Sequence, residues 1–403
     1  MSVRRGDILG MAMGLGLGAS GQVQAALAIV PFVSGSVEYD NNVLRLPNNA
    51  TALQQRGDPR REDAVKTYSV GVGADYSMGA QSLKLGVAAN RTEYNRFTEL
   101  DFEGHEVSGS LNWAVGSIVN GSVTLRDARA LENFAGRTDA VGDRAVRDNT
   151  TVAADAKLRL LSRYEFRPGL QASRARYSLS TSQQQDLDEE TLKFGLSYVG
   201  SGRGDIGLEA VVGQGDYLRR TPGPGVIEEY DQLTLQLVGT WQPSPITTFS
   251  FGAGSSRRDN RGVDVGDNSA FVGNLNVSRT VSVKTSLYTG VYRSVSSSEL
   301  QGESTVVSTG WNVGGNWKPV EGLSFNANFL LQDDRFEDSI AVDNGGERRD
   351  DLQSASVSAE YTVRRWLVLK PYYEWEDRSA EIPGGSYKAY QAGLEVKLQF
   401  PAR

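Results

Sequence analysis

The sequence predicts an all-β fold, a transmembrane antiparallel β-barrel of about 18 strands, and three observations carry this prediction. From Ala28 to the end, stretches of about 10–14 residues alternate between apolar and polar side chains. The connectors between these stretches alternate between short and long. Mean hydropathy is −0.38, and the only sustained apolar run lies near the N-terminus. This polar average excludes a bundle of membrane-spanning helices, whereas a barrel needs only every second residue to be apolar.

The first 25 residues have the pattern of an export signal. Arg4 and Arg5 precede a mostly apolar run from Ile8 to Leu17, and Val23-Gln24-Ala25 resembles a signal-peptidase site. We therefore expect residues 1–25 to be a cleaved signal peptide and residues 26–403 to form the barrel. The chain has no cysteine, which excludes a lipidated N-terminus and a disulfide scaffold and suits a bacterial envelope protein.

The alternation is strict in several stretches. In Ser82–Asn90 the apolar side chains of Leu83, Leu85 and Val87 share one face, and Lys84 lies on the other. The stretch Tyr390–Phe400 repeats this pattern near the C-terminus. A period of two places one row of side chains toward an apolar medium and the other toward water.

The connectors fall into two classes, eight short and nine long, which together join eighteen strands. Short turns on one rim and long, charged loops on the other are typical of outer-membrane barrels. The expected short turns are Met78–Ala80, Gly116–Ser117, Leu161–Arg163, Gly200–Gly204, Gln242–Pro245, Arg279–Val281, Pro319–Gly322 and Val363–Arg365. The expected long loops are Asp40–Ala64, Thr98–Gly104, Glu132–Arg147, Leu179–Leu187, Leu218–Ile227, Asn260–Asp267, Ser297–Glu303, Asp338–Arg349 and Ala380–Ser386.

Aromatic residues gather at the ends of the predicted strands, which predicts two lipid-facing belts. Beside short turns or the C-terminus lie Tyr76, Trp113, Tyr198, Trp241, Trp317, Trp366 and Phe400; beside long loops lie Tyr39, Tyr94, Phe97, Tyr177, Tyr217, Tyr230, Tyr292, Phe336 and Tyr387. The rival fold is a β-propeller, because a hairpin repeat of about 42 residues resembles a blade period. Propeller blades carry a recurring motif that this sequence lacks. Pro168 and Pro371 interrupt predicted strands and predict bulges there.

Two stretches resemble a known family. Asp40–Pro47 reads DNNVLRLP, and Asn90–Gly104 reads NRTEYNRFTELDFEG. Together they resemble the outer-membrane barrels associated with exopolysaccharide biosynthesis in exosortase-containing bacteria, the EpsL-like family. The resemblance implies a role in exporting or assembling extracellular polysaccharide, with that polymer and periplasmic export or synthase components as partners. Such barrels usually end on an aromatic residue, whereas Pro401–Arg403 follow Phe400 here.

Side chains of the polar rows would line a water-filled bore. Basic residues on these rows slightly outnumber acidic ones although the chain carries a net charge of −7, so we predict a weakly cationic bore that favours anionic saccharides. For each charged residue the alternative to contact with the saccharide is an ion pair with an opposite charge on a neighbouring strand. The predicted lining residues are Lys84, Arg126, Lys157, Arg159, Arg167, Lys193, Lys284, Lys318, Lys370, Lys397, Tyr288, Tyr292 and Tyr372. The acidic residues expected among them are Glu38, Asp75, Asp155, Glu165, Glu209, Glu360, Glu374 and Glu395.

The sequence offers little for other chemistry. His105 is the only imidazole, and on a strand it shares a face with neither Glu106 nor Ser108, so no hydrolase triad is ready-made. Acidic loops at Asp333–Asp351 and Asp264–Asn268 lack the spacing of an EF-hand. We predict no cofactor, no metal, no enzyme activity and no nucleic-acid partner.

The predicted protein is therefore a channel or accessory for exopolysaccharide export in the outer membrane of a Gram-negative bacterium, in contact with outer-membrane lipid and lipopolysaccharide. A nutrient-uptake porin and an outer-membrane hydrolase remain as alternatives. A growth defect on one nutrient in a deletion strain that still makes normal polymer would favour the uptake porin.

Overall fold

The computed structural model describes residues 25–132, 134–135, 143–200, 202–222, 226–261, 268–297, 305–337 and 348–400. The expected signal peptide, apart from its last residue, and Pro401–Arg403 lie outside these ranges. Within them, no helix has both the length and the apolar character needed to span a membrane.

Eighteen strands form the wall, and their number and order agree with the sequence prediction. In the described parts of the long connectors there are three short helices, α1 (Asn49–Arg56), η1 (Thr98–Leu100) and η2 (Ser182–Gln185). The strands are β1 (Ala25–Asp40), β2 (Asp63–Met78), β3 (Gln81–Tyr94), β4 (Phe102–Val115), β5 (Val119–Leu131), β6 (Val146–Leu161), β7 (Tyr164–Tyr177), β8 (Leu187–Val199), β9 (Gly204–Tyr217), β10 (Glu229–Ser244), β11 (Thr247–Arg261), β12 (Asn268–Ser282), β13 (Thr285–Ser297), β14 (Thr305–Val320), β15 (Leu323–Glu337), β16 (Arg348–Arg364), β17 (Leu367–Ala380) and β18 (Tyr387–Gln399).

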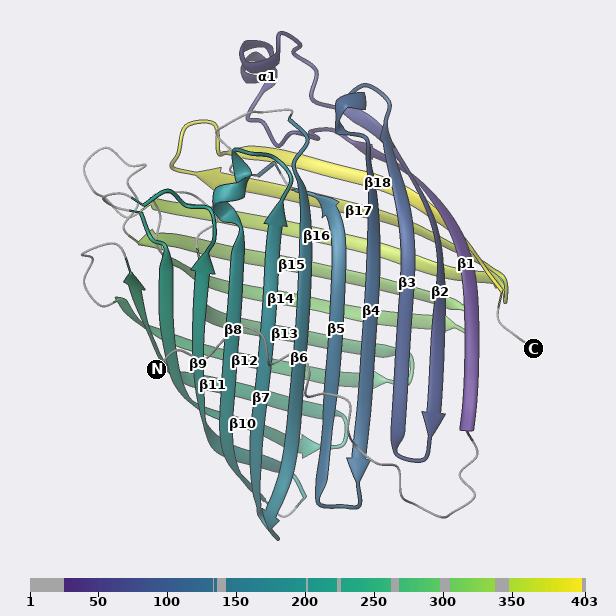
Figure 1. The fold of residues 1–403 in the computed structure, drawn as a ribbon. Helices are drawn as coiled ribbons and strands as arrows, with labels where there is room; N and C mark the ends of the chain where they lie inside the picture. Colours follow the sequence, from purple (N-terminus) through teal and green to yellow (C-terminus); the bar gives the residue numbers. More distant parts are fainter. Residues whose placement is uncertain are drawn as a thin grey trace.

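The sheet closes on itself. Each strand pairs antiparallel with its neighbours in sequence, and β1 pairs with β18 as well as with β2, so that Phe32 lies opposite Gln399. In Figure 1 the strands of the near wall cross those of the far wall, as expected for tilted barrel strands. Along Phe32–Asp40 the first strand pairs with the last, so the sheet has no open edge there, as a sheet in lipid requires. One continuous sheet excludes the propeller.

The two rims differ as the connector lengths predict. The short turns hold glycines in the left-handed region that side chains disfavour, with φ of 60° at Gly79 and 59° at Gly116. The turn between β12 and β13 falls at residues 283–284, later than the expected Arg279–Val281. The β12–β13 ladder shifts its register between Thr280 and Ser282, just before this turn, so the strand pairing continues beyond the expected position.

The bulges expected at the two prolines are absent. The β6–β7 ladder pairs Asp155 with Gly169 and Leu158 with Phe166, so the register is unchanged across Pro168. Pro371 likewise lies in a gap of the β16–β17 ladder without a shift. Each proline pairs normally with its other neighbour, Phe194 for Pro168. Because proline has no backbone N–H, each one interrupts the ladder on one side of its strand without shifting the register.

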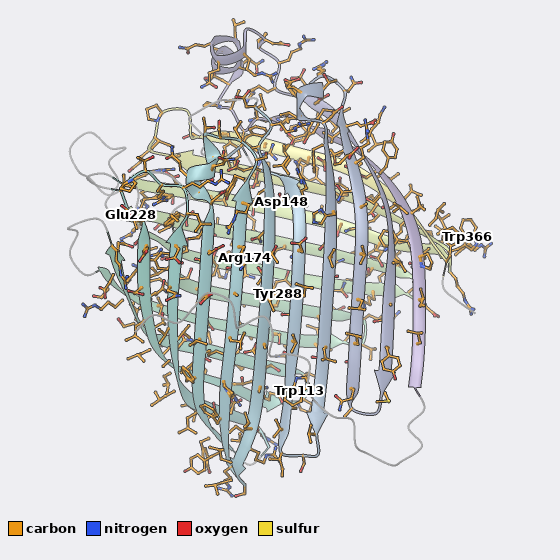
Figure 2. All side chains as sticks on the ribbon, viewed as in Figure 1. Trp113, Asp148, Arg174, Glu228, Tyr288 and Trp366 are labelled. Atoms are coloured by element: carbon orange, nitrogen blue, oxygen red, sulfur yellow. The ribbon has the colours of Figure 1, made fainter. Side chains whose placement is uncertain are left out.

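The outer wall is apolar over most of its height. Alternate residues of every strand face outward, and large apolar ones stay exposed, such as Leu208 at 68% and Leu235 at 55%. The short-turn rim carries the expected aromatic belt, in which Trp113 (Figure 2), Trp241 and Trp317 lie on outward rows. These features give the lipid-facing belt of a membrane barrel.

The second expected belt, beside the long loops, is wrong for most of its members. Tyr39 faces outward and is 43% exposed, but the other strand residues of the set face inward and are mostly buried. Tyr177 and Tyr387 are each 4% exposed, and Tyr230 is 5% exposed. They pack beneath the long loops instead of contacting lipid. Charged side chains occupy the outer wall at this level, where Figure 2 labels Asp148 and Arg174.

The long loops have a hydrophobic core of their own. Residues from the connectors β1–β2, β3–β4 and β5–β6 pack together at the rim below α1 (Figure 1): Val43, Leu44, Leu46, Ala52, Phe97, Leu100 and Phe134. Asn42 fixes the first loop, because its amide donates to Leu46 O at 2.8 Å and to Lys388 O at 3.0 Å. The segments Asp40–Pro47 and Asn90–Gly104 therefore meet in one cap at the long-loop rim.

Candidate functional site: the bore and its mouth

The bore is lined by the inward rows, and these contain twelve of the thirteen residues predicted to line it. Strand register and the apolar outward rows fix their orientation. The exception is Lys284, which lies in the β12–β13 turn and donates from Nζ to Pro319 O at 2.5 Å. No described helix lies among the strands of the wall, since all three belong to the long connectors.

Charges occupy only part of the inner wall, the arc that runs from β16 through β1 to β9. Arg167 on β7 binds Glu165 at 2.9 Å and Asp205 on β9 at 2.7 Å. Lys193 on β8 pairs with Asp155 on β6. Arg126 lies 3.3 Å from Glu106. We name this part of the inner wall the charged arc.

Several inward lysines of the charged arc make no ion pair within the described strands. Lys84, Lys157 and Lys370 have none, while the Lys397 ammonium lies 4.1 Å from the centre of the Phe32 ring. Lys84 lies opposite Asp75 in the ladder, and Lys370 opposite Glu395. Basic and acidic residues therefore face each other in rows.

The rest of the inner wall, from β10 to β15, is lined by neutral polar groups. Among the described residues its charged side chains stay near the ends, with Arg258 and Asp334 toward the long loops and Lys318 near a short turn. We name this part the amide wall. Its amide-bearing inward residues include Gln232, Gln236, Asn260, Asn274, Asn276, Asn312, Asn316, Asn326, Asn328 and Gln332.

Tyrosine rings lie flat along the amide wall. The Tyr288 hydroxyl donates to Asn328 Oδ1 at 3.2 Å, and the Tyr292 hydroxyl donates to Gln332 Oε1 at 2.6 Å, each reaching across β14. The rings occupy the space above Gly314 and Gly310, where a Cβ atom would collide with them. Tyr288 is still 41% exposed, so one ring face remains available to a solute.

Tyr372 belongs to the other part of the wall. It lies over Gly393 in the charged arc and donates to Glu38 Oε2 at 2.6 Å. Its ring is therefore held in the same way as those of Tyr288 and Tyr292, but beside a carboxylate.

Sequence reasoning missed a set of arginines stacked on aromatic rings at the long-loop mouth. The guanidinium carbon of Arg220 lies 3.4 Å from the centre of the Tyr217 ring, and Arg258 lies equally close to Tyr230. Arg348 stacks on Phe336 at 4.1 Å. Burial lowers the pKa of the Arg220 guanidinium, and the charge of Arg258 acts in the same direction. Strand parity was the available signal, since Arg258 shares a face with inward Ser250.

His105 and the acidic loops form no catalytic or metal site within the described residues. His105 faces outward, and its Nε2 lies 2.7 Å from Asp127 Oδ2, while Ser108 faces the bore. Asp333 and Asp351 pair with Arg349 on the outer wall, and most of the Asp264–Asn268 loop lies outside the described ranges. No cluster of His, Cys, Asp and Glu able to hold a metal ion occurs where the chain is described.

A closed barrel with an apolar outer wall and a polar bore is an outer-membrane β-barrel with a porin-like channel. The model of a family described as "Putative beta-barrel porin 2" matches residues 245–400. That segment contains most of the amide wall and part of the charged arc. No curated protein sequence matches the chain.

Solved structures with similar folds include three from Pseudomonas aeruginosa. OccK2 (OpdF) in complex with glucuronate is 12% identical, with 93% of this chain and 98% of that chain covered and a TM-score of 0.48. OpdK with vanillate is 14% identical, with 93% and 99% covered and a TM-score of 0.46. The siderophore receptor PirA is 11% identical, with 92% and 80% covered and a TM-score of 0.43.

Proposed function

We propose that this barrel is a passive channel that admits small hydrophilic solutes into the periplasm and favours uncharged, hydroxyl-rich ones such as saccharides. The amide wall carries this proposal. Side-chain amides and tyrosine hydroxyls donate and accept hydrogen bonds without a net charge, and flat rings pack against the apolar faces of sugar rings. The porin description of the family model that matches residues 245–400 supports a channel.

The geometry gives little support for an anion-selective bore. Arg126 and Arg167 are paired with carboxylates, and the inward acidic residues include several beyond those counted from sequence, among them Glu106, Asp205 and Asp350. Paired charges of opposite sign cancel at the distance of a passing solute. We therefore expect weak ion selectivity.

Planar-bilayer recording of the purified barrel tests the proposal. We expect an open channel with similar permeability to K⁺ and Cl⁻, and reduced current when a neutral trisaccharide is added. The variant Asn312→Asp places one charge in the middle of the amide wall and should make the channel prefer cations. Gln214→Glu adds the same charge on the outer wall, where the Gln214 amide contacts Glu190, and should leave selectivity unchanged. A strongly anion-selective channel, or one indifferent to the sugar, would contradict the proposal.

Polysaccharide export is the second candidate, because the resemblance of Asp40–Pro47 and Asn90–Gly104 to the EpsL-like family favours it. A wall of amides and tyrosines suits a sugar chain moving in either direction. A deletion strain separates the two. Loss of growth on a saccharide with normal extracellular polymer supports uptake, and loss of the polymer with normal growth supports export.

A further inference from the structure

A groove crosses the outer wall near the long-loop rim, behind the amide wall. It has a volume of about 990 Å³ and lies between two outward rows of side chains, with the backbone of the intervening row, which contains Gly310, as its floor. Over β13, β14 and β15 the upper row is polar and the lower row is apolar, and on β16 the two rows continue as Asp351 and Gln353. On β13, β14 and β15 the upper row is Arg293, Thr309 and Asp333, and the lower row is Val291, Trp311 and Leu331.

The groove follows two neighbouring outward rows across the strands. Its two flanking rows are two residues apart along each strand, which separates them by about 7 Å. The upper row opens beside Arg293, because the residue opposite it on β12 is Gly273, which carries no side chain. A chain in the groove would contact apolar side chains, and its head would lie beside a guanidinium.

Arg293 differs from the other arginines of the outer wall at this level. Those on the described strands bind carboxylates: Arg91, Arg129, Arg174, Arg176, Arg257, Arg261, Arg335 and Arg349. The guanidinium of Arg293 donates to Thr309 Oγ1 at 2.8 Å and has no ion-pair partner in the described part of the chain. A positive charge at the edge of the apolar wall is available for an anionic group.

We propose that this groove binds a phosphorylated glycolipid of the outer leaflet, with one phosphate on Arg293 and Thr309 and one acyl chain along Val291, Trp311 and Leu331. The long-loop rim of such barrels faces the outer leaflet, whose lipid combines phosphates with several acyl chains. Charge-assisted hydrogen bonds from a guanidinium to phosphate are strong when partly shielded from water. The site is independent of the solute that crosses the bore.

Native mass spectrometry of the delipidated barrel in detergent tests this site, with bisphosphorylated lipid A as the probe. We expect one lipid A to be retained per barrel, and Arg293→Gln to weaken retention about tenfold, the effect of losing one charge-assisted hydrogen bond. Arg293→Lys should retain part of the binding. Arg257→Gln, a matched change on β11 outside the groove, should bind as the native barrel does. Heat-dependent electrophoretic mobility verifies that each variant is folded.

Several results would overturn the proposal. Equal retention by the native barrel and Arg293→Gln would remove the phosphate contact. Equal retention of dephosphorylated lipid A would leave only apolar adhesion, and equal binding of glucosamine phosphate would show that no acyl chain is needed. A dimer mass without bound lipid would assign the groove to a second copy of this chain.

Discussion

At the short-turn rim the tryptophan rings Trp113, Trp241 and Trp317 face lipid, whereas most aromatic residues beside the long loops face the bore. Trp317 stacks on Phe325 with ring centres 5.3 Å apart, and Trp317 is 50% exposed on the outer wall. At the other rim Tyr230 is 5% exposed beneath Arg258, and ion pairs occupy the outer wall. Aromatic residues at strand ends therefore have one of two roles: they contact the lipid interface, or they pack beneath the long loops. Position at a strand end alone does not distinguish the two roles.

Among substitutions that test this difference between the rims, we expect the largest loss of stability at Asp350. Its side chain is 2% exposed at the long-loop mouth. It accepts hydrogen bonds from Arg348 Nε at 3.1 Å and from Arg378 Nη2 at 2.6 Å. Asp350→Asn leaves buried guanidinium groups without this charge and should lower the free energy of unfolding by about 3 kcal/mol, measured by urea unfolding in lipid vesicles. Asp351→Asn is the control, because that carboxylate faces outward and is exposed. Equal effects of the two variants would show that burial at the mouth is energetically unimportant.

The second effect concerns the loop core. Phe97 is 4% exposed and lies under Arg56, whose guanidinium carbon is 4.5 Å from the ring centre. Phe97→Ala should cost about 3 kcal/mol in the local stability of the cap without unfolding the barrel. Faster amide hydrogen exchange in residues 94–101, with unchanged exchange in β10–β15, would verify this. Leu53 is an exposed residue of α1, so Leu53→Ala should change hydrogen exchange neither in residues 94–101 nor in β10–β15.

The third effect is at the short-turn rim. Trp317→Ala removes a lipid-facing ring and its contact with Phe325, and should lower the unfolding free energy by about 1 kcal/mol. Trp241, which stacks on Phe249 at 5.2 Å, should give the same result. A loss as large as that of Asp350→Asn would mean that the two rims do not differ in energy.

The smallest effect is expected for the ion pairs of the outer wall. Lys388 lies 2.7 Å from Asp377 and its side chain is 78% exposed. Lys388→Gln should change the free energy of unfolding by less than about 0.5 kcal/mol in the same measurement, because solvent screens an exposed pair. A cost above 1 kcal/mol would indicate that the pair is shielded by lipid headgroups.

Strand number, connector classes and the facing of the bore residues followed from sequence because alternation is a local property. Lys84 and Arg167 face the bore for the same reason that Leu83 and Leu170 face lipid. Tyr177 could also have been placed inward, since it shares the parity of Arg167. Two features could not be predicted from the sequence: the stacking of Arg258 on Tyr230 and the groove beside Arg293. Each combines side chains from different strands or loops, and their contact depends on the register between strands.

Gly314 and Gly310 determine how closely the rings of Tyr288 and Tyr292 lie against the inner wall. Because Gly314 and Gly310 present bare backbone, each ring can recline into the wall. Any larger residue at either position would push the ring away from the wall toward the bore, because its Cβ atom would collide with the ring. The absence of a side chain at these two glycines thus fixes how far the two rings extend into the bore, and one substitution there would move a ring while the strands stay the same.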